Sequence, residues 1–261
     1  MKSYLLICAL FFSVTAGAQK KPAPNVDSLK YELYKATNDS LRYRLLETLS
    51  YREIYKDGDI ALGYGKEMLA ISNKWGDRRK MGYAYYCIGL ANMSLGNFKE
   101  VKQDFLKSIE IFQFAGDKEY EAGANCNIGL TFSRSKHYSK ALPYLYRARK
   151  LLTDSNINSA FLANTNMVLG YVRTCLHKYD SSEYYLFSAA QEYEANGNKN
   201  NLSTCYYYIG NLYGKQKRYV EMEVYEQKAL NLAKDLDKTK SITLCTQKLK
   251  YAQRKIGNKI N

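Results

Sequence analysis

The sequence contains little of what catalytic and metal-binding sites are usually built from. It has two histidines, His137 and His177, both expected at turns, and neither has a histidine or cysteine companion at metal-ligand spacing. No Gly-x-Ser-x-Gly motif occurs, and no pair of acids stands isolated in an apolar setting. Residues 63–66 (GYGK) lack the upstream glycine and the following serine or threonine of a phosphate-binding loop. The sequence therefore favours a protein that is not an enzyme and has no metal or cofactor.

Cys-x-x-Cys pairs are also absent, which argues against a redox role. Of six cysteines, Cys8 lies in the first apolar run. The remaining five fall in predicted helices, whose axes lie about 8–10 Å apart when they pack side by side, further than a disulfide tolerates. Their odd number also leaves at least one thiol free. We expect buried, reduced thiols that behave as small apolar residues: Cys87, Cys126, Cys175, Cys205 and Cys245.

No apolar run after residue 18 is long enough to cross a bilayer, which takes about 20 residues. The first run, Tyr4–Val14, is itself shorter; it follows Lys2 and precedes Ala16-Gly17-Ala18, the order of a secretory signal peptide and its cleavage site. A membrane anchor is the alternative. We expect residues 1–18 to be removed and the mature chain to be exported and soluble, either periplasmic or secreted. Residues 19–37 would form a short extended leader and a small helix that begins at Asp27-Ser28.

Acidic residues are missing from the last part of the chain. The formal net charge is +14, and loss of Lys2 with the signal peptide leaves 14 − 1 = +13, because residues 1–18 contain no acid. Residues 238–261 hold seven positive charges and no Asp or Glu. This region is either a solvated face or a patch that binds an anionic surface. Binding to nucleic acid is disfavoured because the sequence contains no known nucleic-acid-recognition motif. The patch comprises Lys248, Lys250, Arg254 and Lys255.

The main feature that is present is a repeat of 40 or 41 residues. A glycine recurs at Gly89, Gly129, Gly170 and Gly210. Nine residues after each glycine an aromatic residue recurs at Phe98, Tyr138, Tyr179 and Tyr219. A small or apolar position follows at Ala61, Val101, Ala141, Ser182 and Met222. Since glycine inside a helix costs about 0.5–1 kcal/mol, its return predicts a place where two helix backbones approach closely.

Each repeat is predicted to form two antiparallel helices. The second helix carries apolar residues at helical spacing, for example Phe98, Val101, Phe105, Ile109 and Phe112. One helical pair cannot bury such a stripe, so neighbouring pairs must stack. Gly76-Asp77, Gly116-Asp117 and Gly197-Asn198 separate the repeats, with glycine ending one helix and a capping side chain starting the next. We predict an all-α solenoid of five helical pairs, started at Asp39-Ser40 and closed by a capping helix over residues 241–257.

At these residues the chain resembles the tetratricopeptide-repeat family, over about residues 38–257. The resemblance implies a right-handed superhelix whose first helices line a concave face. The pattern departs at Leu49 and Lys250, which stand where glycine is expected, and at Glu226, where other repeats carry an apolar residue. The 40-residue form is similar to the extracytoplasmic sensory domains of Bacteroidota kinases and regulators. The family's small residue in the second helix corresponds to Met68, Ser108, Ala148, Ala189 and Ala229.

Aligning the repeats with the tetratricopeptide-repeat pattern gives the positions of the first helices that would face the concave groove. They are rich in tyrosine, leucine, methionine and cysteine, which suits an amphipathic helix or an extended apolar peptide. The alternative is that longer helices close the superhelix and these residues fill its interior. A clamp for a terminal carboxylate is disfavoured, because only two asparagines are available for it. The predicted groove residues are Tyr86, Leu90, Met93, Cys126, Asn127, Leu130, Met167, Tyr171, Tyr207 and Asn211.

These observations predict an exported, non-enzymatic scaffold that binds a partner protein or peptide on the concave face. One alternative is a sensory or ligand-binding module of a signalling system. A second alternative is a protein that binds the envelope surface through the basic C-terminal helix. No contact with nucleic acid and no membrane span are expected.

Overall fold

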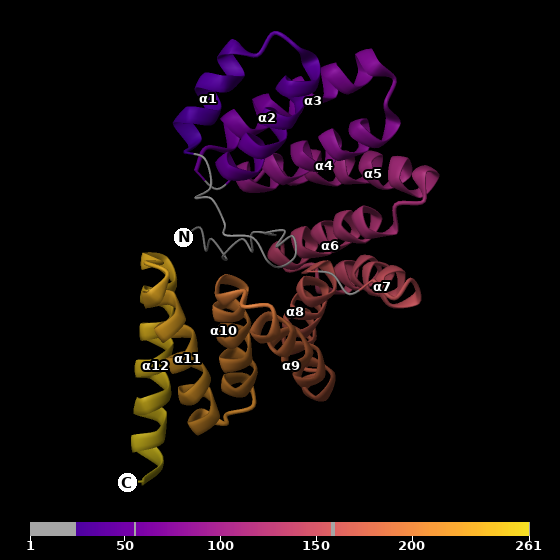
Figure 1. The fold of residues 1–261 in the computed structure, drawn as a ribbon. Coiled ribbons are helices and arrows are strands. Elements are labelled where there is room, and N and C mark those ends of the chain that lie inside the picture. The colour runs from indigo at the N-terminus through magenta and orange to yellow at the C-terminus, as the bar shows by residue number, and fades with distance from the viewer. Residues whose placement is uncertain (1–24, 55, 158–159, 261) are drawn as a thin grey trace. The chain divides into compact units, whose positions relative to one another are not determined.

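The computed structural model describes residues 25–54, 56–157 and 160–260, and in these residues the regular structure is entirely helical (Figure 1). The all-α class is therefore confirmed, whereas the number of repeats and the handedness of a superhelix stay predictions. The signal peptide predicted for residues 1–18 lies outside the described residues. The helices are α1 (Val26–Lys35), α2 (Asp39–Glu53), α3 (Gly58–Trp75), α4 (Arg78–Leu95), α5 (Phe98–Ala115), α6 (Lys118–Arg134), α7 (Tyr138–Asp154), α8 (Ala160–Cys175), α9 (Tyr179–Ala195), α10 (Lys199–Lys215), α11 (Tyr219–Asp235) and α12 (Thr239–Ile260).

The described chain divides into two compact units at the Thr131–Phe132 bond, which lies within α6. We call residues 25–131 the N-unit and residues 132–260 the C-unit. In the N-unit α2 packs on α3, α3 on α4, and α4 on α5. In the C-unit the same succession runs from α7 to α12, and α8 also contacts α10. Helices that follow one another in the sequence are thus neighbours in each unit, as in a stacked-repeat protein.

The turns between repeats follow the predicted Gly-Asp and Gly-Asn pattern. Gly76 ends α3 with φ +67° and Gly116 ends α5 with φ +67°, the left-handed conformation that glycine adopts without strain. Asp77 then starts α4 by accepting a hydrogen bond from the Lys80 amide at 2.9 Å. At the next junction Asp117 accepts more weakly from the Tyr120 amide, at 3.3 Å. These turns confirm the boundaries read from the sequence.

The recurring helix glycines lie where two helices touch. A methyl group on Gly89 would lie 3.0 Å from the Phe105 ring, and one on Gly170 would lie 2.5 Å from Cγ of Leu186 and 3.2 Å from its backbone nitrogen. Real Cβ atoms essentially never come as close as at Gly170 and rarely as close as at Gly89, so glycine allows the first and second helix of a repeat to pack closely. The predicted close approach is confirmed at these two positions.

Three helix boundaries differ from the sequence prediction. Helix α1 is capped by Asn25 and α2 by Asn38, whose Oδ1 accepts from the Leu41 amide at 2.9 Å. The side chain of Asp39, expected to cap α2, instead pairs with Lys74 at 2.7 Å. Helix α12 spans Thr239–Ile260, longer at both ends than the predicted cap.

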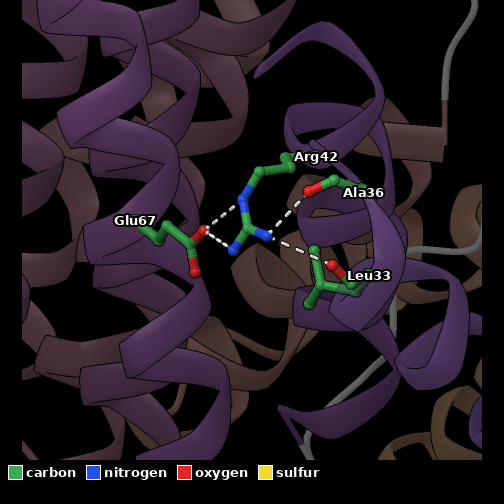
Figure 2. Close-up of polar contacts among 4 residues, drawn as sticks. All are labelled: Leu33, Ala36, Arg42 and Glu67. Carbon is green, nitrogen blue, oxygen red and sulfur yellow. Dashed lines mark hydrogen bonds and ion pairs between the residues drawn. The ribbon is translucent and has the colours of Figure 1, made fainter. Parts of the chain in front are cut away.

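Helix α1 is fastened to the repeats by apolar burial and by one arginine. Leu29 and Leu33 are buried in the core that α2, α3 and α4 share. Arg42 of α2 donates to the carbonyl oxygens of Leu33 and Ala36, both at 3.2 Å, and also binds Glu67 of α3 (Figure 2). Arg42 thereby caps the C-terminal end of α1, where the Leu33 carbonyl also accepts a hydrogen bond from the Ala36 amide at 3.3 Å.

The C-unit buries α12 through a narrow apolar stripe. Its most buried residues are Cys245 and Ala252, at 2% and 0% exposure. In the described residues no helix is both long enough and apolar enough to span a bilayer.

Candidate partner-binding site

The structure divides the ten predicted groove residues into two groups. Six of them are at most 6% exposed, so they fill the interior of their unit, and for them the prediction of an accessible lining is wrong. Neighbouring helices are close enough to cover these side chains; for example, the Asn127 amide donates to the Tyr86 hydroxyl at 2.9 Å in the N-unit. The buried six are Tyr86, Leu90, Met93, Cys126, Asn127 and Met167.

The other four, Leu130, Tyr171, Tyr207 and Asn211, are half-buried. Three of these belong to the C-unit, where Tyr171 of α8 stacks on buried Tyr208 of α10 with ring centroids 4.8 Å apart. Tyr207 lies 5.9 Å from the Tyr208 ring, and half-buried Tyr138 lies 6.3 Å from Tyr171. We call Tyr138, Tyr171 and Tyr207 the tyrosine strip. Burial raises the pKa of Tyr171 and of Tyr207, so both rings present neutral hydroxyls.

The N-unit contains a second half-buried group, which the sequence analysis did not identify. Glu47 and Tyr51 of α2, Tyr83 of α4 and Tyr120 of α6 come together there, and all four remain partly exposed. The Tyr83 ring lies 5.2 Å from Tyr120 and 6.1 Å from Tyr51. The Tyr83 hydroxyl acts to lower the pKa of Glu47, Tyr51 and Tyr120, whereas burial raises the pKa of all three. We call these four residues the Glu47 cluster.

Burial sets the protonation of the Glu47 cluster. Desolvation raises the pKa of the Glu47 carboxyl, which the hydrogen bond from Tyr83 and the charge of Lys80 partly offset. It also raises the pKa of Tyr120 to about 12. The sequence signal for the cluster is weak: Tyr83 lies six residues before Gly89, on the same predicted helix as the groove residue Tyr86. The predicted groove residues lie nearer the glycine, as Tyr86 and Leu90 do, and therefore do not include Tyr83.

The C-unit also contains a carboxylate in its core. Glu226 of α11 is 0% exposed and touches Gly210 of α10, where an added methyl group would lie 2.7 Å from Oε1. Within the part of the chain that the structure describes, neither carboxylate oxygen has a partner at hydrogen-bonding distance and angle. Burial raises the pKa of Glu226 to about 8, although Lys248 and the Cys245 thiol, both on α12, act to lower it.

The predicted basic patch is only partly on the surface. Lys250 and Arg254 are exposed, and the Arg254 guanidinium lies 5.9 Å from the centroid of the Tyr251 ring. Lys248 and Lys255 are half-buried, and Lys248 acts on the buried Glu226. The exposed patch is therefore smaller than the sequence predicted.

The cysteines and histidines lie close to where they were predicted. Among the cysteines that the structure describes, four thiols are buried, Cys175 is partly exposed, and no disulfide is formed. Burial raises the pKa of Cys245 to about 12, which disfavours the reactive thiolate. His137 and His177 occupy turns. Among the described residues no group of three His, Cys, Asp or Glu side chains is placed to hold a metal ion.

No protein-family model matches the chain, and no curated protein matches it. Solved structures do match. The apo form of RapI has a TM-score of 0.59 at 17% identity, over 89% of this chain and 90% of that one. A Rap protein complexed with competence and sporulation factor has a TM-score of 0.60 at 15% identity, over 89% and 70%.

A signal-transduction ATPase from Pyrococcus horikoshii that carries a tetratricopeptide-repeat sensor matches with a TM-score of 0.64 at 18% identity. The match covers 87% of this chain but 35% of that protein. At these identities the similarity concerns the fold, and the fold is that of tetratricopeptide-repeat proteins.

Proposed function

We propose that this protein is an exported scaffold that binds a partner protein or peptide through half-buried tyrosines on its repeat helices. The observation that carries the proposal is the tyrosine strip. Tyrosine supplies a large apolar contact area with a polar tip and is enriched where proteins bind one another. Tyr171 and Tyr207 remain accessible although the helices around them are densely packed.

The order of residues in the first 18 positions supports export, with a periplasmic or secreted location after cleavage. The fold supports the binding role, because stacked helical repeats form extended surfaces that partner proteins use. The protein has no catalytic step in this proposal.

The test is an affinity capture from an envelope extract with residues 19–261 as bait. The Tyr171→Ala/Tyr207→Ala double variant should retain about tenfold less of a specifically captured partner. Tyr184→Ala is the matched control, because Tyr184 of α9 is 60% exposed and lies outside the strip. Circular dichroism and thermal melting establish that each variant is folded. Equal capture by the double variant and the control would refute the role of the strip.

A second candidate is a sensory module that binds a peptide signal. The similarity to a Rap protein complexed with competence and sporulation factor and to a tetratricopeptide-repeat sensor favours it. A cognate peptide at 100 times its Kd would stabilise the fold by about 2.7 kcal/mol, which a thermal-shift screen detects.

A third candidate is binding to an anionic envelope surface through Lys250, Arg254 and Lys255 of α12. Such binding should weaken steeply between low and physiological salt. It should also disappear when residues 238–261 are removed, whereas capture through the tyrosine strip should remain.

A further inference from the structure

Helix α12 and the helix on which it packs, α11, contain two buried polar groups without a hydrogen-bond partner. Glu226 of α11 is 0% exposed and Ser241 of α12 is 5% exposed. Within the described part of the chain, neither the Glu226 carboxylate oxygens nor the Ser241 hydroxyl has a partner. Each group loses its hydration on burial and gains no hydrogen bond in exchange. The packing of α12 therefore carries a cost that the earlier helix pairs, with an apolar residue at the position of Glu226, do not have.

The apolar contacts that oppose this cost are small. The most buried apolar residues of α12 are Cys245 and Ala252, and its larger residues Ile242 and Leu249 are only partly buried. Helix α12 is the last helix of the described chain and packs along α11 (Figure 1). Its release leaves the packing among α8, α9, α10 and α11 in place, so it is a smaller opening than the unfolding of the whole unit.

The charge of Glu226 adds to the cost when this residue ionises. On the α10 side, an added methyl group on Gly210 would lie 2.7 Å from its Oε1. The titratable groups that face it are Tyr207 of α10, and Cys245 and Lys248 of α12. Burial raises the pKa of Tyr207, and it raises the pKa of Cys245 to about 12, so both stay protonated where Glu226 titrates. Lys248 acts to lower the pKa of Glu226, but burial outweighs it.

We propose that α12 is a pH-sensitive cap, which stays packed on α11 while Glu226 is protonated and is released more readily once this carboxyl ionises. Release removes the helix that covers Glu226 on one side, so that water can solvate the carboxylate. It also uncovers the side of α11 on which α12 lies. The proposal goes beyond the binding of a partner through the tyrosine strip and does not depend on it.

The direction of the pH effect follows from the protonation of Glu226 in the two states. With α12 packed, the pKa of Glu226 is raised to about 8, whereas a solvated carboxyl titrates near its ordinary pKa of 4.5. Between these values the released state binds fewer protons than the packed state. The ratio of released to packed molecules should therefore rise by up to about tenfold per pH unit from about pH 5 to about pH 8, and level off above that.

Hydrogen exchange of the full chain, followed by mass spectrometry between about pH 5 and about pH 8, tests the cap. For peptides within residues 239–252, the exchange rate in the unmodified protein is divided by the rate in Glu226→Leu at the same pH. This ratio cancels the intrinsic effect of pH on exchange, because leucine does not ionise. We expect the ratio to rise at least about tenfold across this range, whereas peptides of α8 should keep a constant ratio.

Glu226→Gln is a second neutral variant that keeps the shape of the side chain, and it replaces Glu226→Leu as the reference if the leucine variant does not fold. Glu110→Gln is the control, because Glu110 is exposed on α5, and it should show the same pH dependence as the unmodified protein. Thermal melting verifies that each variant is folded.

Two results would overturn the proposal. In the first, the ratio for α12 does not change with pH, which would mean that ionisation of Glu226 does not release the helix. In the second, the ratio rises equally in α8, α9 and α12, which would mean that the C-unit opens as a whole. Neither result affects the capture experiment with the Tyr171→Ala/Tyr207→Ala variant.

Discussion

Glu226 occupies a position that the earlier repeats fill with Phe105, Leu145 and Leu186, all 0% exposed. In the unfolded chain its carboxyl ionises near the ordinary pKa of 4.5, whereas the folded protein holds the proton up to about pH 8. Between these values the folded state binds more protons than the unfolded state. The free energy of unfolding should therefore decrease as pH rises through this window and level off above about pH 8.

Glu226→Leu restores the side chain found at 145 and 186 and should stabilise the protein. We expect a gain of about 1–4 kcal/mol at pH 8–9, and a smaller gain near pH 5, where the carboxyl is already neutral. Urea unfolding at several pH values measures this, with Glu110→Gln as the control. A gain that does not depend on pH would contradict the assigned protonation.

Three glycines show that the effect of a glycine-to-alanine substitution on stability depends on the backbone conformation and on the neighbouring atoms. Gly63 of α3 has no atom within 4 Å of an added methyl group, so Gly63→Ala should stabilise its helix by about 0.5–1 kcal/mol. Gly116 has equal space but φ +67°, so Gly116→Ala should destabilise by about 1 kcal/mol. Gly170→Ala should cost about 1–3 kcal/mol through its clash with Leu186. The midpoints of thermal unfolding should rank the variants in that order.

At the scale of elements, α1 depends on a few side chains of its neighbours. A helix of 10 residues is marginal by itself in water, and Arg42 holds its last carbonyls. Arg42→Gln should loosen α1 while the remaining repeats stay folded. Hydrogen exchange should then show faster exchange in residues 26–35 alone, whereas Arg44→Gln, at an exposed position of α2, should leave their exchange unchanged.

The sequence predicted the helices better than it predicted which side chains are accessible. Period, turn glycines and apolar spacing are local properties, and they located the turns at Gly76 and Gly116 correctly. The depth of a side chain depends instead on the size of residues that neighbouring helices bring over it. For that reason Tyr86 was assigned to the groove but is buried, and the half-buried Tyr83, one turn earlier, was missed. Glu226 was recognised as a departure, but its complete burial required the structure.

At the scale of the whole molecule, the chain has 26 tyrosines, and those that are buried make the stability of the fold sensitive to alkaline pH. Burial raises the pKa of many of them, including Tyr43, Tyr83 and Tyr86. An acid whose pKa is higher in the folded state makes the protein less stable as pH rises above the ordinary value. Tyrosinate absorbance should therefore rise in two phases: a gradual phase from exposed rings near pH ~10, and a cooperative phase that coincides with loss of helical circular dichroism. A single gradual phase would contradict the burial.

The succession of contacts between consecutive helices also bears on how the chain reaches its native state. Contacts that are close in sequence cost little loop-closure entropy and allow folding in microseconds to milliseconds. Each hairpin can form as soon as its own residues emerge from a ribosome or a translocation pore, before the rest of the chain is available. A chain delivered across a membrane in an extended form would then recover its structure progressively from the leading end, without waiting for its last residue.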